Sequence, residues 1–261
     1  MNFVSSRAFL GVACATLSLT GCVGLRPSDL GPIVTDRPDF TESTDVVPSG
    51  MIQIEGGYTF ASAGDERAHT VGEILIRVPI ARRMEVRLEP GSYVSVEGVA
   101  SELEEPGAGF KVELLQGAET GGRFSPAISL LAGTSLPKEF GRGSYQPEAK
   151  LAIGLELTER FSFASNLNYA YLKEVTRRFN QYSASASLAA GIGEKTGSYL
   201  EYFIFNRESV GGSASGYLNG GLTYQFNNDF QADARIGVGL VGREVGSGGR
   251  YFMGIGLARR W

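Results

Sequence analysis

A cluster of charged side chains near the N-terminus is the part of this sequence best suited to polar chemistry. Asp36, Arg37, Asp39 and Glu42 fall within seven residues and follow neither the 3.6-residue period of a helix nor the alternation of a strand. A guanidinium can fork onto a carboxylate with two parallel hydrogen bonds. The cluster therefore predicts a dense polar contact, which either closes an opening as a gate or holds two parts of the fold together as a latch.

The chain offers little for nucleophilic or metal chemistry. Its single histidine, His69, precedes Thr70, and the next alternate position is Val71 rather than a serine. A Ser–His hydrolase needs those two side chains next to each other. Cysteine occurs only at Cys14 and Cys22, so histidine and cysteine cannot supply a metal-ligand set. We expect no catalytic residue, no metal and no cofactor.

The rest of the chain alternates between apolar residues and small or polar ones, which is typical of β-strands. Each alternating stretch is near the roughly 9–11 residues that cross a bilayer as a tilted strand. No apolar run of 18 residues follows the N-terminal region, and the mean hydropathy is −0.04, so we expect no transmembrane helix. The stretches are 51–61, 70–80, 84–96, 108–115, 124–134, 145–157, 161–172, 181–192, 198–206, 216–226, 230–241 and 250–261.

The links between these stretches favour a membrane barrel over a soluble β-sandwich. Long links at 62–69, 97–107, 135–144, 173–180, 207–215 and 242–249 alternate with mostly shorter ones. External loops and periplasmic turns produce this alternation, whereas a sandwich has no reason to show it. The sequence therefore predicts an all-β fold, a transmembrane antiparallel up-and-down β-barrel of about twelve strands over 51–261.

The N-terminal region is predicted to direct export. Arg7 precedes a short apolar stretch, and residues 1–21 have the features of a signal peptide. The apolar stretch ends in Leu19-Thr20-Gly21-Cys22, which resembles a lipobox. Cys22 is therefore a candidate lipidation site and the candidate first residue of the mature protein. The alternative is an ordinary signal peptide with an incidental cysteine. Residues 22–50 lack alternation, and we expect them to form an extended periplasmic segment.

In a membrane barrel the apolar face of each strand points to lipid and the polar face lines the lumen. Charges of both signs occupy the predicted lumen face. They could line a narrow water-filled pore and tune its selectivity, or form a salt-bridged plug. The candidates are Glu55, Glu73, Arg77, Glu85, Arg87, Glu89, Lys111, Glu113, Glu148, Lys150, Glu156, Glu201, Asp233, Arg235 and Arg260.

The C-terminal strand ends in an aromatic residue, Trp261. A terminal aromatic on an amphipathic strand resembles the signal that bacterial barrel assembly machinery recognises on outer-membrane proteins. We therefore expect outer-membrane lipid and that machinery as partners. The formal net charge of −4 gives no reason to expect nucleic acid.

Two neighbouring segments, Ile33–Ser43 and Val47–Tyr58, resemble an outer-membrane transporter family named for the MetA pathway of phenol degradation. The resemblance implies a channel or transporter for small molecules, with hydrophobic or aromatic compounds as candidate solutes, in the bacterial outer membrane. The alternatives are a structural or surface barrel with a closed lumen and, more remotely, an outer-membrane hydrolase. The gate or latch motif comprises Thr35, Asp36, Arg37, Pro38, Asp39 and Glu42.

Overall fold

The computed structural model describes residues 30–117, 125–138, 144–242 and 250–261. The predicted signal peptide, 1–21, and the candidate lipidation site Cys22 lie outside the described residues. Within the described part of the chain, no helix is long and apolar enough to cross a membrane.

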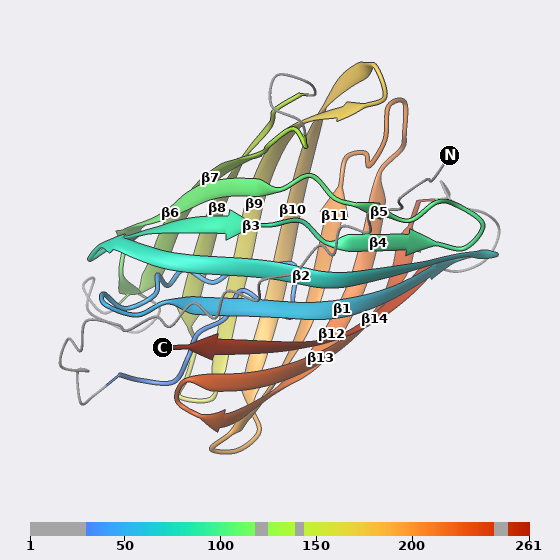
Figure 1. Ribbon diagram of the computed structural model, residues 1–261. Coiled ribbons are helices and arrows are strands. Elements are labelled where there is room, and N and C mark those ends of the chain that lie inside the picture. Colours follow the sequence, from blue (N-terminus) through green and yellow to red (C-terminus); the bar gives the residue numbers. More distant parts are fainter. Residues whose placement is uncertain (1–29, 118–124, 139–143, 243–249) are drawn as a thin grey trace, which may run out of the picture.

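A single antiparallel sheet closes on itself as a barrel (Figure 1), because β1 pairs with both β14 and β2. Twelve of the strands form the closed wall, and β4 and β5 are a short extension beside β2. The predicted fold class is confirmed. The strands are β1 Gln53–Ala63, β2 Glu66–Ala81, β3 Met84–Glu89, β4 Tyr93–Val96, β5 Glu102–Leu103, β6 Gly107–Leu115, β7 Pro126–Ser135, β8 Gln146–Glu156, β9 Phe161–Glu174, β10 Arg177–Gly191, β11 Thr196–Phe205, β12 Ser215–Asn227, β13 Phe230–Val241 and β14 Arg250–Arg260.

Two prolines interrupt the third predicted strand and the end of the second. Pro90 lies between β3 and β4, which pair with successive parts of β2. Pro79 precedes a shift in the pairing of β2 with β3. Proline has no N–H group to donate to the ladder, so both positions are ones where a strand breaks or bulges.

Two links that the sequence predicts to be long are two-residue turns, at 64–65 and 175–176. The strands on each side run further than expected, with Ala63 opposite Glu66 and Glu174 opposite Arg177. Most side chains in these extensions are polar or charged, and both faces carry such residues. The alternation of hydrophobicity therefore ends before the backbone ladder does.

The barrel has an inverted distribution of polarity. Its fully buried large side chains include Arg77, Lys111, Glu55 and Glu201, all of which face the lumen. Large apolar side chains such as Leu167, Leu200, Ile236, Ile255 and Leu257 are exposed on the outer surface. Apolar atoms outside and ionised groups inside suit a wall that faces lipid.

A segment without regular secondary structure lies inside this barrel, at the end where the C-terminus lies (Figure 1). We call residues 33–47 the plug segment. Ile33, Thr41 and Val47 are buried, and the Ile33 N–H donates to the carbonyl of Asn228 in the turn between β12 and β13, at 2.7 Å. The plug segment lies within the lumen, where its polar groups find partners on the wall.

Candidate functional site

Four glutamates of the barrel wall hold the backbone of the plug segment. Each carboxylate accepts one or two hydrogen bonds from backbone N–H groups of the plug segment. These bonds replace the ones that a helix or sheet would provide. The glutamates come from β1, β3, β6 and β11, so the segment is fixed to several sides of the lumen at once. The N to O distances are Asp36 to Glu55 3.0 Å, Arg37 to Glu55 3.1 Å, Phe40 to Glu201 2.9 Å, Thr41 to Glu201 2.7 Å, Val46 to Glu113 2.9 Å and Val47 to Glu85 2.8 Å.

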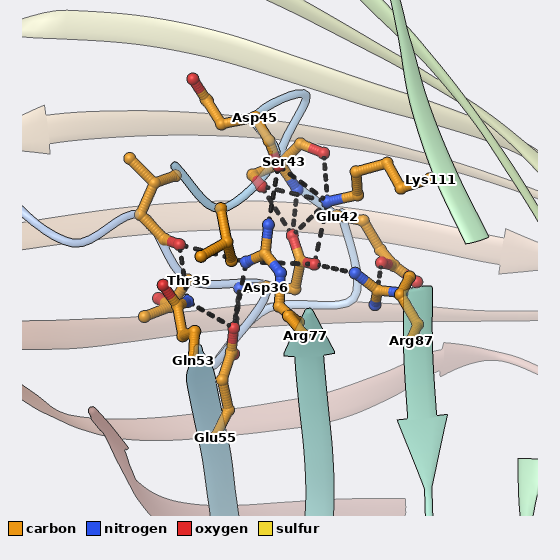
Figure 2. A network of polar contacts seen from close by, with 12 residues as sticks. Thr35, Asp36, Glu42, Ser43, Asp45, Gln53, Glu55, Arg77, Arg87 and Lys111 are labelled. Carbon is orange, nitrogen blue, oxygen red and sulfur yellow. Dashed lines mark hydrogen bonds and ion pairs between the residues drawn. The ribbon is translucent and has the colours of Figure 1, made fainter. Parts of the chain in front are cut away.

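Asp36 lies at the centre of a buried charge network (Figure 2). Its carboxylate contacts Lys111 Nζ at 2.9 Å, Arg77 Nη1 at 3.5 Å and Arg87 Nη1. Burial alone would raise the pKa of the Asp36 carboxyl, but Arg77, Lys111 and Arg87 together hold that pKa well below its usual range. Asp36 therefore stays ionised as the common counter-charge of three wall cations.

Wall cations also bind the carbonyl groups of the plug segment. Arg77 Nη2 donates to the Asp45 carbonyl at 2.7 Å, and Lys111 Nζ donates to the Ser43 carbonyl at 3.0 Å. On the opposite side of the segment, Arg235 Nη1 donates to the Pro38 carbonyl at 2.8 Å. Both donor and acceptor groups of the segment's backbone are thus satisfied by side chains of the wall.

A second carboxylate of the plug segment, Glu42, shares Arg87 with Asp36 and also binds Lys150. It lies 2.6 Å from Arg87 Nη2 and 2.6 Å from Lys150 Nζ. Burial would raise the pKa of Glu42, but Arg87 and Lys150 lower it below its ordinary value. Arg77, Arg87, Lys111 and Lys150 come from β2, β3, β6 and β8, so cations on four strands of the wall face the acidic residues of the plug segment.

Arg37 fits against a flat part of the wall formed by two paired glycines. Gly57 of β1 lies opposite Gly256 of β14, and a Cβ atom added to either would overlap the Arg37 guanidinium. Arg37 Nη1 lies 2.8 Å from Glu73, and its Nε lies 3.6 Å from Asp233. Small residues on this face of β14 therefore make room for the plug segment, a role that their alternation alone does not reveal.

Asp39 has surroundings unlike those of Asp36. It lies near the Glu201 carboxylate, and its Oδ2 lies 3.4 Å from the Ser187 hydroxyl. Burial and the Glu201 charge raise the pKa of Asp39 well above its usual range. The plug segment thus carries one acid that is stabilised in its ionised form and one that favours the protonated form.

One cavity borders the plug segment, and a second adjoins the first. One of about 330 Å³ is bordered by Asp36, Arg37, Phe40 and Glu42 of the segment and by the facing wall. Another of about 510 Å³ lies between the ends of β1, β2, β11, β12 and β14. Phe205 and Arg235 line both, so the two cavities meet at these side chains.

The structure brings most of the predicted lumen residues together around the plug segment. Glu73, Glu89, Glu148, Lys150 and Arg235 line the 330 Å³ cavity, while Glu156 is exposed at the end of β8. Arg260 is buried and donates to the Gly31 carbonyl at 2.8 Å. Buried inside the barrel are Glu55, Arg77, Glu85, Arg87, Lys111, Glu113, Glu201 and Asp233.

Neutral and aromatic lumen residues are absent from the sequence-based candidates. The aromatic ones include Phe203 and Phe205 of β11, Tyr217 of β12 and Phe252 of β14. Around Phe203 both faces of β11 are apolar, so hydrophobicity does not tell them apart. Glu201 lies two residues before Phe203 and therefore on the same face, and its charge identifies that face as the inner one. Gln53, Asn166, Asn219, Ser129 and Ser185 are buried inside as well.

His69 lies in β2 rather than in a loop. Its Nδ1 is 2.8 Å from the Tyr58 hydroxyl, and its ring centroid is 5.2 Å from that of Phe60. This arrangement belongs to an aromatic group on β1 and β2. Within the part of the chain that the structure describes, no group of three or more His, Cys, Asp or Glu side chains could hold a metal ion.

The inverted barrel and its charged lumen define a porin-like β-barrel of the bacterial outer membrane. A family model described as "Putative MetA-pathway of phenol degradation" matches residues 35–252, and the chain belongs to this family. The match begins within the plug segment and reaches the last strand.

The chain is similar to solved structures of outer-membrane porins, and the likeness to the NanC porin shows the shared fold. The NanC porin covers 80% of this chain and 98% of its own, with 8% identity and a TM-score of 0.53. The KdgM porin, solved in complex with disordered oligogalacturonate, covers 79% and 98%, with 14% identity and a TM-score of 0.48. OccK11 of Pseudomonas aeruginosa covers 78% and 62%, with 11% identity and a TM-score of 0.41. No curated protein sequence matches the chain.

Proposed function

We propose that this protein is an outer-membrane channel for small molecules whose pore is closed by the plug segment. One observation carries the proposal: a segment with no regular structure fills part of the lumen and is held there by polar contacts to the wall. Twelve strands lie between the small filled barrels and the wide porins, so removal of such a segment leaves a narrow aqueous path.

The wall is built to tolerate loss of the plug segment. Arg77 Nε pairs with Glu85 at 2.8 Å, and Arg77 Nη1 pairs with Glu55 at 3.1 Å. Arg87 lies 3.2 Å from the same Glu85. These ion pairs join wall residues to one another, so Arg77 and Arg87 keep partners and gain water when the segment leaves. Lys111 binds Asp36, Ser43 and Asp45 of the segment, and water replaces those contacts. If the plug segment were a permanent part of the barrel's structure, the wall cations would not need these additional ion pairs with wall carboxylates.

Hydrophobic or aromatic compounds are candidate solutes. The family description and the aromatic side chains of the lumen support this group of compounds. The barrel assembly machinery is the proposed partner in insertion, through Trp261. A structural barrel with a permanently closed lumen is the alternative function.

A reversible tether between the plug segment and the wall tests the proposal. Thr41 Oγ1 and Ser185 Oγ of β10 lie 2.7 Å apart, so cysteines at these positions can form a disulfide. The double variant Thr41→Cys/Ser185→Cys, with Cys22→Ser, is placed in a planar bilayer under voltage. We expect no openings when it is oxidised and openings after a reductant is added.

The single variants Thr41→Cys and Ser185→Cys are the matched controls, and a reductant should leave both unchanged. Equal conductance before and after reduction would show that the plug segment does not control the pore. If neither form ever opens while both are folded barrels, the closed structural barrel is the better description.

A further inference from the structure

A group of aromatic side chains lies inside the barrel, where polar residues are the rule. The ring of Phe203 stacks on that of Tyr217, with centroids 5.0 Å apart and planes 18° from parallel. Phe205 meets Phe203 edge-on at 5.9 Å, and Phe252 lies 6.4 Å from both Phe203 and Tyr217. The ring of Phe252 lies across Gly237 of β13, where a Cβ atom would overlap it.

These aromatic rings border the cavity of about 510 Å³. Binding sites for small molecules are commonly hollows of roughly 300–1,000 Å³ lined by apolar and aromatic side chains, with a few polar groups that fix orientation. This cavity combines aromatic rings with charged side chains, among them Arg235, Arg250 and Glu208, and it has room for a single-ring compound with its hydration water. We call Phe203, Phe205, Tyr217, Phe252 and Arg235 the aromatic site.

Arg235 gives the aromatic site its cation. Its guanidinium lies 5.6 Å from the ring centroid of Phe252, and its Nη2 donates to Thr59 Oγ1 at 2.8 Å. Its ion pair with Glu73 is long, at 3.6 Å, and Glu73 also serves Arg37. A guanidinium has five N–H donors in a fork that matches a carboxylate. A ligand with an aromatic ring and one carboxylate therefore suits this site.

The same side chains also anchor the plug segment. Phe40 stacks on Phe203 with centroids 4.6 Å apart and planes 16° from parallel, and it meets Phe205 edge-on at 5.3 Å. Arg235 donates to the carbonyl of Pro38, two residues earlier. A ring that takes the face of Phe203, or a carboxylate that draws Arg235 away, competes directly with Phe40 and Pro38.

We propose that the aromatic site binds aromatic carboxylates and that binding displaces Phe40 and Pro38, which releases the plug segment. The inference rests on the proposed channel function and names both its solute class and its opening signal. The evidence for the inference is the group of aromatic side chains that faces the lumen, together with its contact with the plug segment.

Benzoate is the probe, with cyclohexanecarboxylate and phenol as matched compounds that lack the ring or the charge. The full chain in detergent is tested for binding by saturation-transfer NMR, and in planar bilayers for open probability. Benzoate should bind and raise the open probability at least about 5-fold. The two matched compounds should need roughly tenfold higher concentration, because each loses one of two interactions worth about 1.4 kcal/mol or more.

Variants separate the aromatic site from the rest of the barrel. Phe252→Leu and Arg235→Gln should each weaken benzoate binding about tenfold. Phe226→Leu is the matched control, because Phe226 is exposed on β12 and stacks on Phe230 at 4.9 Å, outside the lumen. It should bind and respond to benzoate as the wild type does.

Failure of this inference is distinguishable from failure of the channel proposal. Benzoate that does not bind, binds without raising the open probability, or acts no better than the two matched compounds overturns the inference. A chain lacking residues 33–47 needs no ligand to open, so its conductance decides the channel proposal independently.

Discussion

Asp36 and Asp39 are three residues apart in the plug segment and have opposite electrostatic surroundings. Arg77, Arg87 and Lys111 surround Asp36, whereas Asp39 lies beside Glu201 and Ser187. The first aspartate is a fixed anchor, since breaking a buried ion pair by removing one partner is costly. The second has a raised pKa, so losing its proton weakens the docking of the same segment.

Replacing Arg37 with alanine should loosen the plug segment. Glu73 and Asp233 would lose a cation at 2.8 and 3.6 Å, and charge-assisted hydrogen bonds of this kind contribute about 2 kcal/mol. We expect the ratio of released to docked segment to rise roughly 25-fold. Single-channel recording should show larger or noisier currents from a barrel that still assembles. Arg37→Lys keeps the charge and should have a smaller effect; currents and heat stability equal to the wild type would contradict this role.

The open probability should rise with pH. The docked segment holds a proton on Asp39, whose pKa is raised, whereas the released segment loses that proton above about pH 4. Docking is therefore strongest below this pH and weakens as pH rises through the raised pKa. The contribution of Asp36, whose pKa is lowered, is lost only in more acidic solution. Groups near Asp39 include Glu201, Tyr199, Ser187 and Asp36.

Asp39→Asn tests this pH dependence. The variant carries no titrating group at this position, so its open probability between about pH 5 and 8 should be flat. Recordings of wild type and variant over that range make the comparison. An equal slope in both proteins would assign the pH dependence to another group.

At the scale of elements, the sequence predicts the strands well and the plug segment poorly. Period-2 alternation locates every wall strand, because each face has one environment. It fails at 62–69 and 173–180, where both faces of the hairpins carry polar or charged residues. Residues 33–47 have no period, since wall side chains and not neighbouring strands satisfy their backbone. Their charges indicate a polar contact, but the partners come from β1, β2, β3, β6, β8 and β11, which no local pattern connects.

The closing pair of strands should depend on its terminal residue. Trp261 and Ile52 exchange backbone hydrogen bonds of 2.9 and 3.0 Å beside the β1–β14 pair, and the indole ring is exposed. Trp261→Ser keeps the backbone bonds and removes the aromatic signal. We expect less protein in the outer membrane and more in the periplasm, measured by fractionation. Tyr251→Ser, at the other end of β14, is the control; unchanged amounts for Trp261→Ser would refute the assembly role.

At the scale of the whole molecule, the barrel and the plug segment are held by different forces. Continuous backbone pairing closes the wall, and its apolar outer surface suits lipid. The plug segment depends on side-chain hydrogen bonds and ion pairs, many of which water can replace. The barrel should therefore remain folded under conditions that release the segment, which is the property that a gated channel needs.

Removal of the plug segment tests this account most directly. A chain lacking residues 33–47 is compared with the wild type in planar bilayers, after heat-dependent gel migration and β-type circular dichroism have shown that both are folded barrels. We predict a mostly closed wild type and a steadily open deletion variant. A folded deletion variant that conducts no better than the wild type would contradict the central claim that the plug segment closes the pore.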